Sequence, residues 1–114
     1  MKIQKITKKE EFSHIFKNGN FMNFNSFTIN YAKKFTCRSD ALPRYGIIAS
    51  KKIGNAVKRN FAKRRVKALK NILINNGKKE LDYILVIKKK LLNIKFKTLS
   101  LELEMALEKI KKTL

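Results

Sequence analysis

The chain has 114 residues, of which 28 are Lys or Arg and only 8 are Asp or Glu, so its formal net charge is +20. This length suits one small domain, and a hydrophobic content of 44% is enough for a core despite the charge. The sequence contains no run of about 18 uncharged apolar residues and no apolar signal segment at its start. We therefore expect residues 1–114 to form a single soluble, cytoplasmic domain that does not enter a membrane.

Residue types that commonly carry catalysis are scarce. The single cysteine, Cys37, excludes an intramolecular disulfide and a multi-cysteine zinc site. The only histidine is His14, and the carboxylates are scattered along the chain, without the spacing of a metal-binding cluster. We predict that the protein has no catalytic residues and holds no metal ion through its own side chains.

The first predicted element is a helix that begins in a capping box formed by Thr7 and Glu10 and ends at Gly19. The alternation of Phe27, Ile29 and Tyr31 with smaller or polar residues then predicts a half-buried strand over residues 26–35. A short apolar run over residues 44–50 predicts a second strand, and a weaker pattern over residues 20–25 indicates further strand pairing.

The clearest predicted helix runs from Ala56 to about Asn75 and stops at Asn76-Gly77. At about 100° per residue, one half of its circumference is apolar and the other half is basic. The apolar half includes Phe61, which is predicted to lie in the core, and Arg65, whose stem would follow the core while its head reaches out. The basic half carries Arg59, Asn60, Lys63, Arg64, Lys67, Lys70 and Asn71.

An apolar strand over residues 82–88 and a last helix complete the predicted order of helix, strands, helix, strand, helix. This order indicates an α+β domain in which the helices pack on one small sheet. The last helix is recognised by the spacing of Leu99, Leu103, Leu107 and Ile110.

Positive charge is concentrated around the basic helix. Between Asp40 and Glu80 the chain has twelve basic residues and no acidic one. Three of its five arginines lie in this helix, although lysine is the usual basic residue elsewhere, which indicates bidentate contacts with phosphates or bases. The Gly54-Asn55 turn could offer backbone N–H groups to a phosphate. A polyanion is therefore the expected partner, although a solvated charged face would give the same pattern.

The same residues resemble a known family. Residues 46–60, GIIASKKIGNAVKRN, followed by Lys63-Arg64, resemble the signature S-K-K-x-G-N-A-V-x-R-N-R-x-K-R of the bacterial ribonuclease P protein component. Residues 10–19, EEFSHIFKNG, resemble the family's E-x-F-x-x-V-F-x-x-G helix. Asp82-Tyr83 resembles the start of its last strand, and residues 106–110 resemble its final helix, so the resemblance extends over nearly the whole chain.

The resemblance implies a two-layer α/β sandwich with a mixed four-stranded sheet and three helices in the order αβββαβα. It also implies a left-handed strand–helix–strand crossover between Ile47 and Val86, against the general rule for such connections.

The resemblance further implies the RNA-binding subunit of ribonuclease P, which assists a catalytic RNA in removing the 5′ leader from precursor tRNA. The RNA would carry the active site and its Mg²⁺, with one protein per RNA and no membrane partner. The residues expected to contact the catalytic RNA are Lys51, Lys52, Asn55, Arg59, Asn60, Lys63, Arg64 and Lys67. Those expected to hold the single-stranded leader are Phe12, Phe16, Lys17, Thr28 and Asn30.

Three of these assignments have alternatives. By spacing alone, Phe12 and Phe16 also fit a core. Phe61 stands where the family motif has its second arginine, so one RNA contact is either lost or taken over by Arg65 or Lys58. Asn30 stands where some members carry a leader-contacting tyrosine, which would replace stacking by hydrogen bonding.

Two other function classes remain open from the sequence. A general or ribosomal-type RNA-binding protein would bind RNA tightly without promoting cleavage of precursor tRNA. A free-standing nuclease would cleave RNA with a metal ion and no RNA subunit, against which the scarcity of histidine and clustered acids argues.

Overall fold

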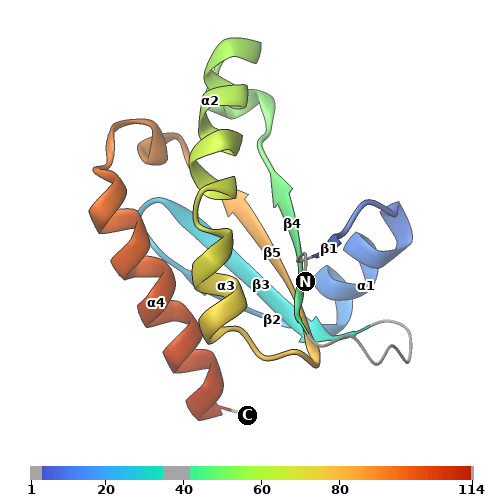
Figure 1. Ribbon diagram of the computed structural model, residues 1–114. Helices are drawn as coiled ribbons and strands as arrows, with labels where there is room; N and C mark the ends of the chain where they lie inside the picture. Colours follow the sequence, from blue (N-terminus) through green and yellow to red (C-terminus); the bar gives the residue numbers. More distant parts are fainter. Residues whose placement is uncertain (1–3, 35–41, 114) are drawn as a thin grey trace.

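The structure, a computed structural model, describes residues 4–34 and 42–113 (Figure 1). Phe35, at the end of the predicted strand, and Cys37 lie outside the described residues. The elements in chain order are β1 (Gln4–Lys5), α1 (Lys9–Asn18), β2 (Asn20–Asn23), β3 (Phe27–Lys33), β4 (Arg44–Ile48), the 3₁₀ helix η1 (Lys51–Ile53), α2 (Ala56–Lys67), α3 (Lys70–Asn76), β5 (Leu81–Ile87), the 3₁₀ helix η2 (Lys89–Asn93) and α4 (Phe96–Thr113).

The described strands form one mixed sheet in the order β1-β4-β5-β3-β2 (Figure 1). The strand β4 is parallel to both β1 and β5, whereas β3 is antiparallel to both β5 and β2. The predicted α+β class and the order αβββαβα are confirmed by α1, the four longer strands, the middle helical segment and α4. The two-residue β1 adds a fifth strand at the edge of the sheet.

The crossover from β4 to β5 is left-handed, as the resemblance implied. In Figure 1 both strands point up the page, α2 and α3 lie in front of them, and β5 lies to the left of β4. In a right-handed crossover the second strand would lie to the right when the helix is in front.

Helices cover both faces of the sheet. On one face, Phe27, Ile29 and Tyr31 of β3 are buried with residues of α2, α3 and α4, so their predicted core position is confirmed. On the other face, Ala32 of β3 lies with Ile15 of α1 in a smaller buried cluster. The predicted stripe of α4, Leu99, Leu103, Leu107 and Ile110, is fully buried in the larger core.

The middle helix differs from its prediction because it is broken into α2 and α3 around Ala68 and Leu69. Leu69 is buried and its backbone N–H bonds to the carbonyl of Val66, so the chain makes a tight turn there that directs this side chain into the core. The end of the helical segment at Asn76, with Gly77 as its cap, is as predicted. Among the described helices, none is both long and apolar enough to cross a membrane.

The predicted capping box at the start of α1 is wrong. The helix begins at Lys9, and its N-cap is Lys8, whose side chain makes no capping hydrogen bond. The carboxylate of Glu11, in the first turn, is bound to a partner in the sheet rather than to the helix backbone.

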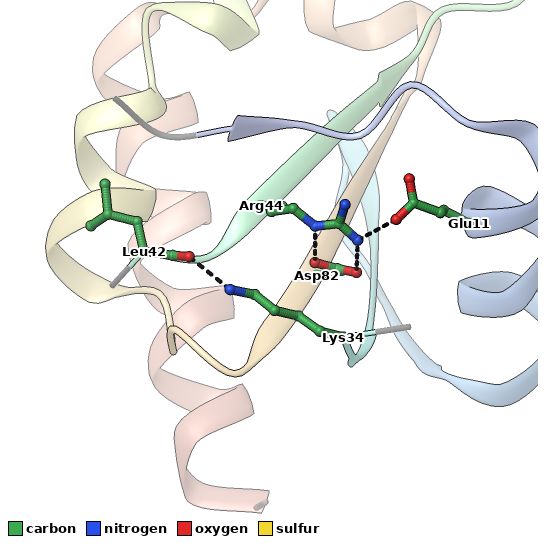
Figure 2. Close-up of polar contacts among 5 residues, drawn as sticks. All are labelled: Glu11, Lys34, Leu42, Arg44 and Asp82. Carbon is green, nitrogen blue, oxygen red and sulfur yellow. Dashed lines mark hydrogen bonds and ion pairs between the residues drawn. The ribbon is translucent and has the colours of Figure 1, made fainter. Parts of the chain in front are cut away.

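That partner is Arg44, the centre of a buried ion cluster (Figure 2). The guanidinium of Arg44 donates from Nε to Asp82 Oδ1 at 3.0 Å and from Nη2 to Asp82 Oδ2 at 2.7 Å. Its Nη2 also lies 2.6 Å from Glu11 Oε2. The hydrogen bond with Asp82 is the main reason that the pKa of Arg44 is raised further above its ordinary value. The cluster joins α1 to the adjacent strands β4 and β5.

We predict that Asp82→Ala lowers the free energy of unfolding by about 3–5 kcal/mol, because it removes the bidentate partner of a buried cation. Urea denaturation monitored by circular dichroism measures this change. Glu108→Ala is the control, because Glu108 pairs with Lys112 on the surface of α4, where an ion pair contributes little. Equal destabilisation by the two substitutions would contradict the structural role of the cluster.

Candidate nucleic-acid interface

One face of α2 is basic and open to solvent. Asn60, Arg64 and Lys67 are exposed, and Arg59 and Lys63 are half-buried, along the same side of the helix. Lys51 and Lys52 are exposed in η1, immediately before the turn into the helix. The structure therefore brings together, on η1 and α2, the residues predicted to contact a polyanion. We call Arg59, Asn60, Lys63, Arg64 and Lys67 the α2 basic face.

The backbone changes direction sharply at the turn that precedes α2. Gly54 has a φ of 141°, a conformation that residues with a Cβ rarely adopt. Asn55 follows as the N-cap, and its Oδ1 accepts a hydrogen bond from the backbone N–H of Lys58 at 3.0 Å. The side chain of Asn55 is exposed, as its predicted RNA-contacting role requires, but its amide oxygen is engaged in the cap.

Arg59 has a structural role besides its position on the basic face. Its Nη1 donates to the carbonyl oxygen of Gly54 at 3.0 Å, which ties the first turns of α2 to the preceding loop. The guanidinium keeps other N–H donors for a ligand, because arginine has five and only this one is used by the loop carbonyl. Arg59 can therefore position the turn and present a cation at the same time.

Within the described residues, no ion pair neutralises a basic residue of α2. The pKa of Lys5 is lowered, first by burial and then by the positive charges of Lys67 and Lys63. Lys5, which the sequence pattern did not indicate, is exposed on β1 and lies within the electrostatic field of the α2 basic face. Only the parallel pairing of β1 with β4, which the sequence did not indicate, brings this residue close to the helix.

Two predictions about α2 are wrong. Phe61 was expected in the core, but 41% of its surface is exposed, and Val57 in the same predicted apolar half is 74% exposed. The head of Arg65 was expected to reach out, but it turns inward and donates hydrogen bonds to the carbonyl oxygens of Leu91 and Ile94 around η2. Arg65 therefore docks α2 against η2 and is not in position to replace the motif arginine that is absent at Phe61.

A second open surface lies on the α1 side of the sheet. Here the register places Asn30 beside Ile84, and Thr28 beside Val86. Towards α1, Ala32 and Ile84 are buried, whereas Thr28, Asn30 and Val86 are only half-buried. The helix therefore covers one end of this face and leaves the other end accessible.

The two phenylalanines of α1 differ in burial, and each fits one of the two interpretations that their spacing allowed. Phe12 packs against the smaller core, and its ring lies so close to Gly46 that a Cβ there would be 2.8 Å from it. Phe16, one turn later, is 47% exposed, and Lys17 beside it is exposed as well. The position of Phe12 supports the core reading, while Phe16 remains available to a ligand.

Further residues on this side were missed by the sequence analysis. Phe21 of β2 is directly opposite Asn30 and is 62% exposed, and Asn23 is opposite Thr28, whose hydroxyl donates to its Oδ1 at 2.7 Å. Ile48 of β4 is opposite Val86 and half-buried. We call Phe21, Asn23, Thr28, Asn30, Ile48 and Val86 the open sheet surface. The only sequence signal for Phe21 was the alternation of residue types within β2. This stretch is too short to predict which residues of β3 lie opposite it.

The fold and these surfaces define a small basic α+β protein with an unneutralised helix face and an accessible, partly aromatic sheet. Comparison with known proteins agrees with this class. The sequence profile of the Ribonuclease P family matches residues 1–111. The chain is 35% identical over 113 residues to the ribonuclease P protein component of a Nitratiruptor species, covering 96% of this chain and 94% of that protein.

A second relative is the ribonuclease P protein component of Shouchella clausii, which is 34% identical over 110 residues, covering 96% of this chain and 88% of that protein. The solved structure of the Staphylococcus aureus RNase P protein is similar with a TM-score of 0.78 and 25% identity, covering 96% of this chain and 97% of that one. The chain therefore belongs to the ribonuclease P protein family.

We predict that Lys67→Gln stabilises the free protein and weakens its binding to RNA. Removal of a positive charge that faces Lys63 one turn away should raise the free energy of unfolding by about 0.2–0.5 kcal/mol at low ionic strength. Urea denaturation and binding of a bacterial ribonuclease P RNA measure the two effects. Lys109→Gln, at an exposed lysine of α4 away from the N-terminus of that helix, is the control for loss of charge alone. Equal effects of both substitutions would contradict a local cationic cluster.

Proposed function

We propose that this member of the ribonuclease P protein family is the RNA-binding subunit that assists a catalytic RNA in removing the 5′ leader from precursor tRNA. The observation that carries this proposal is the α2 basic face, which is open and has no carboxylate partner within the described residues. Self-repulsion among these charges destabilises the free protein, and a polyanion relieves it.

The α2 basic face would dock on the catalytic RNA. Arg59 and Arg64 can each donate two parallel hydrogen bonds to a phosphate, and Lys63 and Lys67 add charge along the same side. Lys51, Lys52 and Asn55 extend this contact along the turn before the helix, and Lys5 extends it onto β1. Because phosphate contacts release counterions, the affinity would fall steeply as salt rises.

The single-stranded leader would lie on the α1 side of the sheet. Phe16 offers an exposed ring for base stacking, and Lys17 offers a cation for the backbone. Thr28 and Asn30 would supply hydrogen bonds from β3, and we add Phe21, which lies opposite Asn30, as a second aromatic residue. Phe12 would support this surface from below by packing on Gly46.

The cleavage chemistry would belong to the RNA subunit and its Mg²⁺. Within residues 4–34 and 42–113, no three His, Cys, Asp or Glu side chains come together as they would to hold a metal ion. The protein residues would instead bind and orient two RNAs, with one protein for each catalytic RNA in the cytoplasm.

Reconstitution tests the proposal. Added at low Mg²⁺ to a bacterial ribonuclease P RNA, the protein should increase cleavage of precursor tRNA, and the protein alone should cleave nothing. Arg64→Ala should weaken binding to the catalytic RNA and reduce the slope of log affinity against log salt by about one. The measurement is filter binding at several salt concentrations.

Lys97→Ala, on α4, is the matched control and should leave the affinity for the catalytic RNA nearly unchanged. Tight RNA binding without any gain in cleavage would instead favour a general RNA-binding protein. Metal-dependent cleavage by the protein without RNA would favour a nuclease. Either result would overturn the proposal.

We predict that Phe16→Ala weakens binding of precursor tRNA to the holoenzyme by about 1–3 kcal/mol, the contribution of one stacked base. Binding of mature tRNA, which has no leader, should not change. Fluorescence titration of the two tRNAs against the reconstituted complex measures the difference.

Phe96→Ala is the control for this substitution, because Phe96 lies on α4 and is 45% exposed, close to the 47% of Phe16. An equal loss of affinity for mature and precursor tRNA on Phe16→Ala would place this ring outside the leader site.

A further inference from the structure

An apolar strip interrupts the positive surface of α2. Val57 is 74% exposed and Phe61 is 41% exposed, and the two side chains lie one turn apart on the same side of the helix. The first turns of α2 extend beyond the end of the sheet in Figure 1. A large aromatic ring in such a position is partly in contact with water in the free protein.

The ring of Phe61 is nevertheless held in place. The guanidinium carbon of Arg65 lies 5.6 Å from the ring centroid, in a cation–π contact. Arg65 is itself anchored by hydrogen bonds from its guanidinium to the carbonyl oxygens of Leu91 and Ile94. Because this clamp restricts the ring before any ligand arrives, less side-chain freedom is lost when a ligand binds.

The residues around the strip indicate the chemistry of its partner. Arg64 and Lys58, three residues after and before Phe61, are both exposed and lie on adjacent turns of α2. The sequence has no acidic residue between Asp40 and Glu80 to offset them. A partner that fits must therefore combine negative charge with a flat apolar surface, and an unpaired nucleotide has both.

We propose that Phe61, with Val57 one turn before it on the same side of α2, is a stacking site for an unpaired base of the catalytic RNA, while Lys58 and Arg64 contact the flanking phosphates. This inference rests on the proposed function, because it assumes that α2 faces that RNA. It adds a contact to a base, whereas the α2 basic face is proposed to contact the phosphate backbone. Stacking on an aromatic side chain is sequence-tolerant and contributes to affinity without counterion release.

The chain contains no tryptophan, so Phe61→Trp introduces a single fluorescent reporter at the site. Binding of a bacterial ribonuclease P RNA should quench its fluorescence, because a base would stack on the indole. Phe96→Trp is the matched control, since Phe96 is similarly exposed but lies on α4. At concentrations that saturate every site on the protein, a short single-stranded RNA should quench the Phe61→Trp reporter more than a duplex of the same length. Equal or stronger quenching by the duplex would overturn the stacked-base assignment.

Affinity gives an independent readout. Phe61→Ala should weaken binding to the catalytic RNA at least about fivefold, which is ~1 kcal/mol, and Phe61→Tyr should restore it. The salt slope should not change with Phe61→Ala, in contrast to Arg64→Ala. Urea denaturation of both Phe61 variants shows whether the fold is retained.

The possible failures can be told apart. If the unmodified protein does not bind the catalytic RNA, the proposed function is wrong. If it binds and the fold is retained, but Phe61→Ala binds equally well and Phe61→Trp is not quenched, the stacking site is wrong while the docking of α2 stands. A loss of affinity that Phe61→Tyr does not restore would also overturn the stacking site.

Discussion

The positions of a few carboxylates determine which positive charges of this protein are left without an ion-pair partner. Glu11 and Asp82 are buried against Arg44, and Glu102 accepts a hydrogen bond from the hydroxyl of Ser26 at 2.8 Å. With these acids engaged elsewhere, the described structure leaves the basic residues of α2 without ion-pair partners. The small core must hold the fold together against this repulsion, and the strongest relief available is a polyanionic ligand.

The same ion cluster and the unusual crossover together separate two surfaces. The contact between Glu11 and Arg44 fixes α1 over one end of the sheet and leaves the open sheet surface accessible. Because β4 and β5 are adjacent and parallel, the handedness of their connection decides which face its helices cover. A right-handed connection would place α2 on the same face as α1. The left-handed one places it on the opposite face, so the α2 basic face and the open sheet surface lie on different sides of the sheet.

The periodicity of hydrophobic residues correctly predicted the long elements that pack one face against a core, such as the buried stripe of α4 and the alternation of β3. Periodicity failed where the exposure or direction of a side chain depends on the elements that neighbour it in space. A helical wheel gives the side on which Phe61 lies but not that α2 extends past the sheet, and it cannot show that the carbonyls of Leu91 and Ile94 accept hydrogen bonds from Arg65. Lys5 and Phe21 join the candidate sites through strand pairing, which short segments do not specify.

The proposed binding of the catalytic RNA and the leader to different faces of one protein is tested most directly by lysine footprinting. The reactivity of the lysines towards an acylating reagent would be compared, by mass spectrometry, for the free protein, its complex with the catalytic RNA, and the complex with precursor tRNA added. This separation of the two faces predicts that the catalytic RNA protects Lys63 and Lys67, that precursor tRNA additionally protects Lys17, and that Lys97 and Lys109 of α4 stay reactive. Protection of the α4 lysines equal to that of Lys63 and Lys67, or protection of Lys17 by the catalytic RNA alone, would contradict it.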